Sequence, residues 1–431
     1  MWYRFFWRPA VAGLLLCVAT AAKSDAAPLT LQEAVRRVEQ HSPQLAARAA
    51  ARDAATRRID AARLAPNPDL RLAVEDAFGT GDYRALDAAQ LTLSLVQVVE
   101  PAARRNTRVQ AAEAGVGLEQ AAFDAERWQL LAETHRRYAL AVIRAGRLAL
   151  AQQARANAQR LAAATERRVQ AAAAPVAELE RARVAVARAE LEEEDTEHEL
   201  ASARVSLAAL WQGEDDFGAL VGDPFLLPPM RPLAEWQAAL VSSPALRRFA
   251  AERALLRAEQ ATIAAERQRS WQVDAGLRHY RAGGDLGLVA GVSLPLRWRD
   301  AQTPRLAEAE ARLRAAEAGE AAALAEARAE IFGLYQELNH GSLHLTRLRD
   351  VIVPATQRAL EATEYAVQRG RYGAWEWLAA RNEWLAAQKE MLDDAELLHT
   401  TLAELERVSG LALFSDTSAI KPATDLQGAT P

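Results

Sequence analysis

The chain has 431 residues, of which half are hydrophobic and only 6% aromatic, and its formal net charge is −5 at pH 7. Its abundance of Ala, Leu, Arg and Glu favours long helices over a thick globular core. Arg and Glu alternate along the helical stretches, so the surface is solvated and has no basic patch that would indicate nucleic-acid binding.

The first residues have the pattern of a secretory signal peptide, which we expect to span residues 1–26. Arg4 and Arg8 precede an apolar run too short to cross a bilayer, and Ser24-Asp25-Ala26 is a small-x-small cleavage pattern. A short membrane anchor is the alternative. Cys17 lies in the apolar run after a leucine, where a lipoprotein site needs a small residue, so we expect neither a lipid anchor nor a mature disulfide.

A helical pattern follows from Thr30 to about Leu64. Thr30 and Glu33 have the spacing of a capping box, and Ser42-Pro43 predicts a kink or a second helix that begins at the proline. Pro66-Asn67-Pro68 ends the helix, because proline lacks the amide donor and restricts the residue before it.

Two strand pairs are predicted, at 69–97 and 271–296. In each, apolar and polar residues alternate on both sides of a Gly/Asp turn, Gly79-Thr80-Gly81-Asp82 in the first and Gly283-Gly284-Asp285 in the second. The strands are about ten residues long, which suffices to cross a bilayer at a tilt. No later segment is apolar for long enough to form a membrane helix, so any crossing would have to use these strands.

Two long helical blocks, 102–211 and 304–410, complete the chain. In the second, apolar residues recur every seven positions, which is a coiled-coil repeat and predicts one helix over 304–369, roughly 100 Å long. The pattern weakens at Gln170 to Pro175 and at Gly370 to Ala374, so each block is a helical hairpin with its tip far from the strands. The repeat consists of Leu324, Ile331, Leu338, Leu345 and Ile352.

The two halves of the chain resemble each other at a spacing of about 200 residues. Ser42-Pro43-Gln44-Leu45 returns as Ser243-Pro244-Ala245-Leu246, and Glu178 and Arg183 return as Glu376 and Arg381. We therefore divide the chain into a first repeat, an irregular connector, a second repeat and a flexible tail, with Trp211 and Trp236 as packing anchors at the connector. The predicted boundaries are 27–212, 213–232, 233–410 and 411–431.

Four strands cannot close a barrel, and an open sheet edge is not tolerated in hydrocarbon. Pooling strands from three identical chains would give a twelve-stranded transmembrane β-barrel wide enough for a channel. The same homotrimer would gather its coiled-coil hairpins into a hollow α-barrel. The predicted fold is thus mainly α with a small β part.

The order of elements, the duplication and the signal peptide resemble the TolC-like outer-membrane efflux ducts. Ala65-Pro66-Asn67-Pro68-Asp69-Leu70 and Val98-Val99-Glu100 with Arg104-Arg105 are similar to the CzcC-like heavy-metal branch, and Gly291 to Leu296 is similar to the family's last strand. Pro101-Ala102-Ala103 departs from that branch by replacing its glycines. The resemblance implies an outer-membrane channel with a periplasmic helical extension, a periplasmic adaptor and a proton-driven RND-type inner-membrane transporter as partners, and heavy-metal cations as cargo.

The tips are the predicted functional sites, because arginine and aromatic side chains gather there as they do at contact surfaces. We expect them to contact the adaptor or to gate the channel, with Glu178 and Arg183, and Glu376 and Arg381, as intersubunit ion pairs that hold the end closed. The alternative is a solvated salt bridge worth under about 1 kcal/mol. The predicted tip residues are Gln170, Pro175, Glu178, Arg183, Arg369, Gly370, Arg371, Tyr372, Gly373, Glu376 and Arg381.

Aromatic residues near the strand ends predict a membrane belt in contact with lipid, namely Phe78, Tyr83, Trp271, Tyr280 and Trp298. His340 and His344 are spaced as two ligands on one helical face, but no third ligand is nearby in sequence, so no metal site is predicted. No phosphate loop, nucleophile elbow or His-Glu metal motif occurs, so we expect no enzyme and no cofactor.

Two other functions stay open on the sequence. The same duct could serve drug efflux or type I secretion, which the sequence barely separates from metal export. A protein of another class, a periplasmic structural coiled coil that never enters a membrane, would have the same helical repeats.

Overall fold

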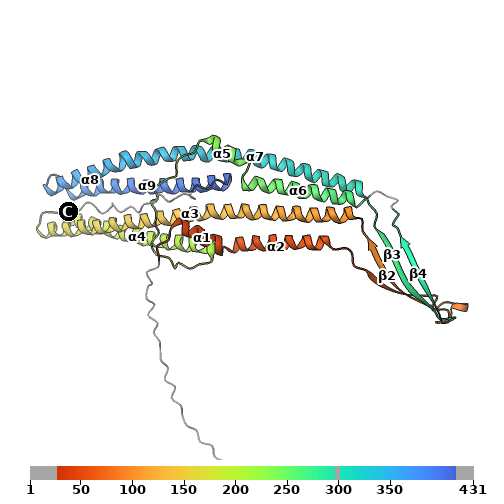
Figure 1. Cartoon of the computed structure of the whole chain (residues 1–431). Helices are drawn as coiled ribbons and strands as arrows, with labels where there is room; N and C mark the ends of the chain where they lie inside the picture. Colours follow the sequence, from red (N-terminus) through yellow and green to blue (C-terminus); the bar gives the residue numbers. More distant parts are fainter. Residues whose placement is uncertain (1–26, 297–300, 414–431) are drawn as a thin grey trace, which may run out of the picture.

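The computed structural model describes residues 27–296 and 301–413. These residues form an elongated rod of helices with a small sheet at one end (Figure 1). At the other end lie the two turns that connect α3 to α4 and α8 to α9. The predicted fold class, mainly α with four strands, is confirmed. The predicted signal peptide and nearly all of the predicted tail lie outside the described residues.

The first repeat begins with a broken helix. Thr30 caps α1 by accepting a hydrogen bond from the Glu33 amide at 3.2 Å, and α2 begins at Pro43, whose missing amide costs nothing in the first helical turn. The break predicted at Ser42-Pro43 is therefore present. The helices of this repeat are α1 Leu31–His41, α2 Pro43–Arg63, α3 Ala102–Gln170 and α4 Val176–Ala208, followed by a short 3-10 turn, η2 Ala209–Trp211.

The second repeat is built in the same way. Its first helix is also broken at a Ser-Pro pair, and the Ser243 hydroxyl caps the second piece by accepting from the Leu246 amide at 3.4 Å. Its helices are α5 Leu233–Leu240, α6 Pro244–Ala265, α7 Gln302–Arg347, α8 Val353–Gln368 and α9 Ala374–Ser409.

The long helix predicted over 304–369 is interrupted, which the heptad pattern missed. A π-helical turn, η3 Leu348–Ile352, separates α7 from α8 just before Pro354. Proline lacks the amide that would bond to the carbonyl one turn earlier, and a π turn adapts the backbone to that loss. The turn shifts the register, so Leu348 is fully buried whereas Ile352, the last predicted heptad residue, is 39% exposed.

The four strands form one antiparallel sheet in the order β1-β2-β3-β4. Strands β2 and β3 join the two repeats, with Leu93 opposite Leu277. The outer strands, β1 and β4, each pair on one side only within the described chain, so both edges of the sheet are open. The strands are β1 Asp69–Glu75, β2 Gln90–Val99, β3 Trp271–Tyr280 and β4 Asp285–Ser293, and a 3-10 turn, η1 Gly81–Tyr83, lies between β1 and β2.

Helix α3 runs along the rod from the sheet end to the tips. Its 69 residues extend for roughly 100 Å, and it contacts α2 and α6 in the half near the sheet and α4 and α9 in the half near the tips (Figure 1). The C-terminal end of α9 abuts the start of α6, where Gly410 lies against Pro244. Shorter helices placed end to end thus flank one continuous helix.

The hydrophobic core lies midway along the rod, where the connector 213–232 packs against the helices. One cluster gathers around Trp211 and Phe217 in the first repeat, and another around Trp236 and Leu240 in the second. Both tryptophans are buried, as expected for packing anchors. This arrangement leaves the tips and the sheet as the two exposed ends.

Candidate functional site

The first tip is a tight turn between α3 and α4. The Ala173 amide donates to the Arg168 carbonyl at 2.7 Å, and Ala172 takes a positive φ of 53°, a conformation that usually belongs to glycine at a helix end. Pro175 precedes the first residue of α4. The turn thus places Gln170 and Pro175 at the exposed end of the rod, where both were predicted.

The second tip lies between α8 and α9 and uses glycine for the same purpose. Gly370 has a φ of 70°, and the Arg371 amide donates to the Ala366 carbonyl at 2.9 Å. The Glu376 carboxylate accepts from the Gly373 amide at 3.0 Å and so caps α9. Arg369 lies over the ring of Tyr365, and Tyr372 is exposed, so cationic and aromatic groups face outward at this end.

The tip acids and arginines have other partners within the chain than the predicted pairs. Glu178 lies 3.8 Å from Arg168, and Arg183 pairs with Glu180 at 2.9 Å. The first contact joins α3 to α4 across the turn, and the second lies within α4. Intersubunit pairing, which the predicted gate requires, stays a prediction.

Arg381 is placed unlike the other tip residues. It is only 3% exposed, its guanidinium stacks on Trp377, and one of its nitrogens, Nη2, donates to the Gln153 carbonyl of α3 at 3.1 Å. Among the described residues no carboxylate pairs with it, and Nη1 has no hydrogen-bond partner. Burial, together with the nearby Arg160, lowers the pKa of Arg381 to about 10.

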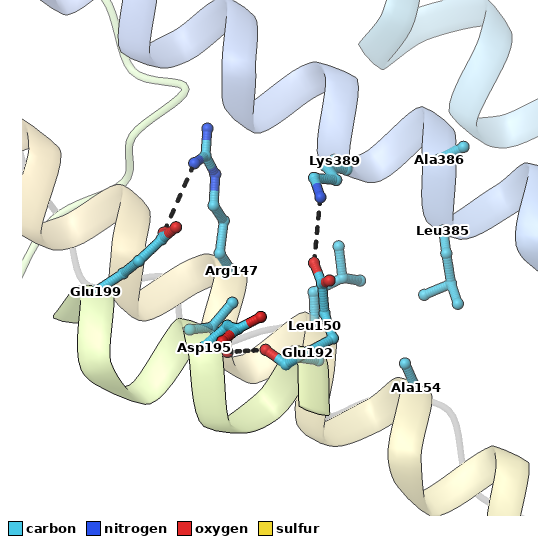
Figure 2. Close-up of a pocket in the computed structure, with 11 residues that line it drawn as sticks. Arg147, Leu150, Ala154, Glu192, Asp195, Glu199, Leu385, Ala386 and Lys389 are labelled. Atoms are coloured by element: carbon cyan, nitrogen blue, oxygen red, sulfur yellow. Dashed lines mark hydrogen bonds and ion pairs between the residues drawn. The ribbon is translucent and has the colours of Figure 1, made fainter. Parts of the chain in front are cut away.

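A groove runs from this arginine along the face shared by α4 and α9, with α3 as its floor. Near the tip it has a volume of about 810 Å³ and a floor that includes Ala154 and Ala158. Farther from the tip it continues into a smaller pocket, where Lys389 of α9 reaches Glu192 of α4 at 3.1 Å (Figure 2). The groove is therefore bounded by charge at the end away from the tip.

The sheet has two chemically different faces. The apolar face carries exposed leucines, including Leu93 and Leu277, while the polar face carries Thr92 and Arg278. Arg278 bonds to Thr92 at 2.9 Å and to Glu75 at 2.7 Å, and so links three strands. Alternation along each strand produces this division because successive side chains point to opposite faces.

The predicted belt aromatics do not share one face. Trp271 and Tyr280 bound the same strand, but they are nine residues apart, an odd spacing that puts them on opposite faces. Tyr280 lies on the polar face with its ring over Gly287, so it is not in the position of a lipid-facing belt residue. Phe78 and Tyr83 are exposed in the β1–β2 connection, and Trp298 lies outside the described residues.

A buried polar cluster that the sequence reading missed lies midway along the rod. His135 of α3 and His399 of α9 meet edge to face, and Glu406 lies 3.5 Å from His135. The Nε2 of His399 donates to the Pro224 carbonyl of the connector at 2.9 Å. Burial, and secondarily His135, lowers the pKa of His399 to about 4. The cluster ties together three segments far apart in sequence.

The histidine pair on α7 lies against α9. His340 and His344 stack, and Nδ1 of His344 contacts the Asp394 carboxylate of α9. Within the described chain, no group of three or more His, Cys, Asp or Glu side chains is arranged to hold a metal ion.

Across residues 27–296 and 301–413, no helix has both the length and the apolar character needed to cross a membrane.

Comparison with known proteins confirms the resemblance to TolC-like efflux proteins. Residues 34–213 match the family described as "Outer membrane efflux protein". The chain is 29% identical over 358 residues to the cobalt-zinc-cadmium resistance protein CzcC of Cupriavidus metallidurans, covering 81% of this chain and 82% of that protein.

Solved structures share the fold at low sequence identity. A membrane protein from Pseudomonas aeruginosa superposes with a TM-score of 0.73 at 18% identity, covering 94% of this chain and 96% of the other. CusC superposes with a TM-score of 0.70 at 15% identity, covering 95% and 99%. The chain thus has the same fold as these two proteins over nearly its full length.

Proposed function

We infer that this chain is an outer-membrane efflux channel of the TolC/CzcC type that works as a homotrimer. The observation that carries the inference is the sheet, which has a leucine-rich face, a polar face and two open edges. A leucine face is stable against lipid, and open edges must be paired before a sheet can enter hydrocarbon. Three copies would pair all edges in a twelve-stranded barrel with the polar face, including Arg278, turned inward.

The helices supply the second part of the proposal. A rod of about 100 Å attached to a membrane sheet spans a distance that no compact domain requires. In a trimer the hairpins would continue the pore as a hollow cylinder that reaches into the periplasm. The exposed tips would then meet a periplasmic adaptor and, through it, an RND-type inner-membrane transporter.

We further propose heavy-metal cations as the cargo. The support is the similarity to a cobalt-zinc-cadmium resistance protein over four-fifths of both chains. The described residues offer no ligand cluster for a metal, which suits a conduit that passes ions without holding them. Choice of the ion would then lie with the transporter and the adaptor.

The test is deletion of the gene in its host, followed by growth in zinc, cobalt and cadmium and, separately, in drugs. Increased sensitivity to the metals, restored by the gene, supports metal export. Sensitivity to drugs alone assigns the channel to drug efflux, and loss of a secreted protein assigns it to type I secretion.

A second experiment separates the channel from a periplasmic structural coiled coil. A channel fractionates with the outer membrane, migrates as a heat-modifiable trimer on gels and conducts ions in planar bilayers. Solubility without detergent and absence of conductance would refute the proposed channel function.

A further inference from the structure

The helices meet the sheet at a junction that is rich in arginine. This collar consists of residues 57–70, 99–108, 266–271 and 301–305, where α2, α3, α6 and α7 approach the strands (Figure 1). It contains nine arginines and four carboxylates, in a chain whose formal net charge is −5. The collar is therefore cationic although the chain as a whole is acidic.

Some of these arginines hold the collar together. Arg108 pairs with Glu100 at 2.6 Å and donates to the Leu64 carbonyl at 3.2 Å, so it joins the end of α2 to the start of α3. Arg305 pairs with Glu266, which joins the start of α7 to the end of α6. Two of the collar's carboxylates are thus already compensated by arginines with a structural role.

Two other arginines, beside the central strands, have no such role. Arg105 lies in the first turn of α3 after β2, Arg269 lies two residues before β3, and both side chains are exposed. The Arg104 guanidinium donates to the Ser270 hydroxyl, which joins these two segments. Among the described residues, no carboxylate pairs with Arg105 or Arg269. Two guanidinium groups on joined segments therefore favour an anion that arrives from outside the chain.

The apolar face of the sheet ends at the same level. Trp271 lies opposite Val99 on this face, and the two are 52% and 49% exposed. Tryptophan is enriched where the hydrocarbon of a membrane meets the lipid headgroups. Strands β2 and β3 are the inner strands of the sheet, so pairing of its edges with other copies would leave this boundary uncovered.

We propose that Arg105 and Arg269 bind the phosphate groups of anionic phospholipids at the periplasmic surface of the outer membrane. The proposal rests on the channel function inferred above, which puts the leucine face in lipid and the helices in the periplasm. Guanidinium groups donate several hydrogen bonds to phosphate oxygens, and their charge attracts an anionic membrane surface. Trp271 lies beside the headgroups, and the three copies of this contact set the depth of the barrel in the membrane.

Native mass spectrometry of the full-length trimer in detergent, titrated with phosphatidylglycerol or with phosphatidylcholine, tests the proposal. We expect the anionic lipid to bind more tightly. Arg105→Gln combined with Arg269→Gln should raise its Kd about tenfold, to that of phosphatidylcholine, because both attracting charges are lost. Both side chains are exposed, so the trimer should still form.

Two further pairs of substitutions control for folding and for total charge. Arg105→Lys combined with Arg269→Lys keeps both charges and should retain the preference for phosphatidylglycerol. Arg349→Gln combined with Arg358→Gln removes two exposed arginines from η3 and α8, far from the collar, and should leave the Kd unchanged.

Four outcomes would overturn the inference while the channel itself stands. The first two are equal affinity of the wild-type trimer for both lipids and an unchanged preference in the double Gln variant. The third is displacement of the lipid by an equal concentration of inorganic phosphate, which would assign a site for a free anion. The fourth is higher cation selectivity of the double Gln variant in planar bilayers of neutral lipid, which would place the arginines in the pore. Absence of conductance in the wild-type protein would instead refute the proposed function.

Discussion

Nε2 of His135 lies 3.4 Å from Nδ1 of His399, so imidazoles from the two repeats meet inside the rod. Because Nε2 of His399 donates to the Pro224 carbonyl, its Nδ1 is the acceptor in the neutral ring, and His135 is the donor between them. This chain of contacts fixes α3, α9 and the connector relative to one another.

We expect acid to destabilise the folded chain through His399. Its pKa is lowered from 6.5 to about 4, so between these values the unfolded chain binds a proton that the folded chain does not. The free energy of unfolding is therefore highest above about pH 6.5. It decreases by at most roughly 3 kcal/mol as the pH falls toward 4. Thermal unfolding of the detergent-solubilised protein across this range should show a falling Tm. His399→Gln, which cannot be protonated, should flatten the dependence, and an equally steep fall in that variant would contradict the assignment.

Tyr138→Phe should loosen the connector. The Tyr138 hydroxyl is buried and lies 2.8 Å from the Leu29 carbonyl and 2.6 Å from that of Val221, so it joins the N-terminal segment to the connector. Removing it leaves the Val221 carbonyl without this donor, at a cost of about 1–3 kcal/mol, while the Leu29 carbonyl still accepts from the Val221 amide. Limited proteolysis within residues 213–232 should accelerate. Tyr365→Phe, at an exposed position on α8, is the control, and equal proteolysis of both variants would argue against the anchor.

Gly276→Ala should disrupt the sheet. A Cβ at this position would lie 2.3 Å from the Leu93 carbonyl oxygen, and backbone on a central strand cannot move aside cheaply. We expect loss of the proposed trimer, measured as heat-modifiable migration on gels. Gly117→Ala on α3 meets nothing within 4 Å and should be neutral or stabilising by up to about 1 kcal/mol. An intact trimer in the Gly276 variant would show that the strand register differs.

Charge on the two faces of the sheet should have opposite consequences. Leu277→Arg places a cation on the apolar face, where lipid exposure costs about 2–4 kcal/mol near the bilayer midplane. Gln272→Arg places the same group on the polar face of the same strand, where water would solvate it. Outer-membrane yield should fall for the first variant alone. Equal yields would mean that the leucine face does not meet lipid.

Pairing of the open edges should depend on β1 and β4. Ala290→Pro on β4 would remove an amide that alternation along the strand directs away from β3, toward the side that is unpaired in the described chain. We expect native mass spectrometry to detect single chains in place of trimers. Val176→Pro, at the first residue of α4, is the control, because proline is tolerated in the first helical turn and this position is far from the sheet. Trimers in the β4 variant would contradict edge pairing as the basis of assembly.

Local patterns determined most of the architecture. Alternation of apolar and polar residues identified the strands because a strand's side chains alternate between two faces whatever lies around it. The Ser-Pro pairs at 42–43 and 243–244 identified both helix breaks, since proline's missing amide acts on its own backbone. The odd spacing of Trp271 and Tyr280 is also visible in the sequence, and it predicts that these two residues lie on opposite faces of the strand.

Contacts between distant segments were decided only by the tertiary structure. Gln153 and Arg381 are 228 residues apart, and nothing local to either residue shows that one accepts a hydrogen bond from the other. His135, His399 and the Pro224 carbonyl likewise come from three segments that are distant in sequence, and only the folded chain brings them into contact. Burial and unpaired donors are properties of packing, so the sequence determined which elements form, while the arrangement of those elements decided that Arg381 is enclosed beside a groove.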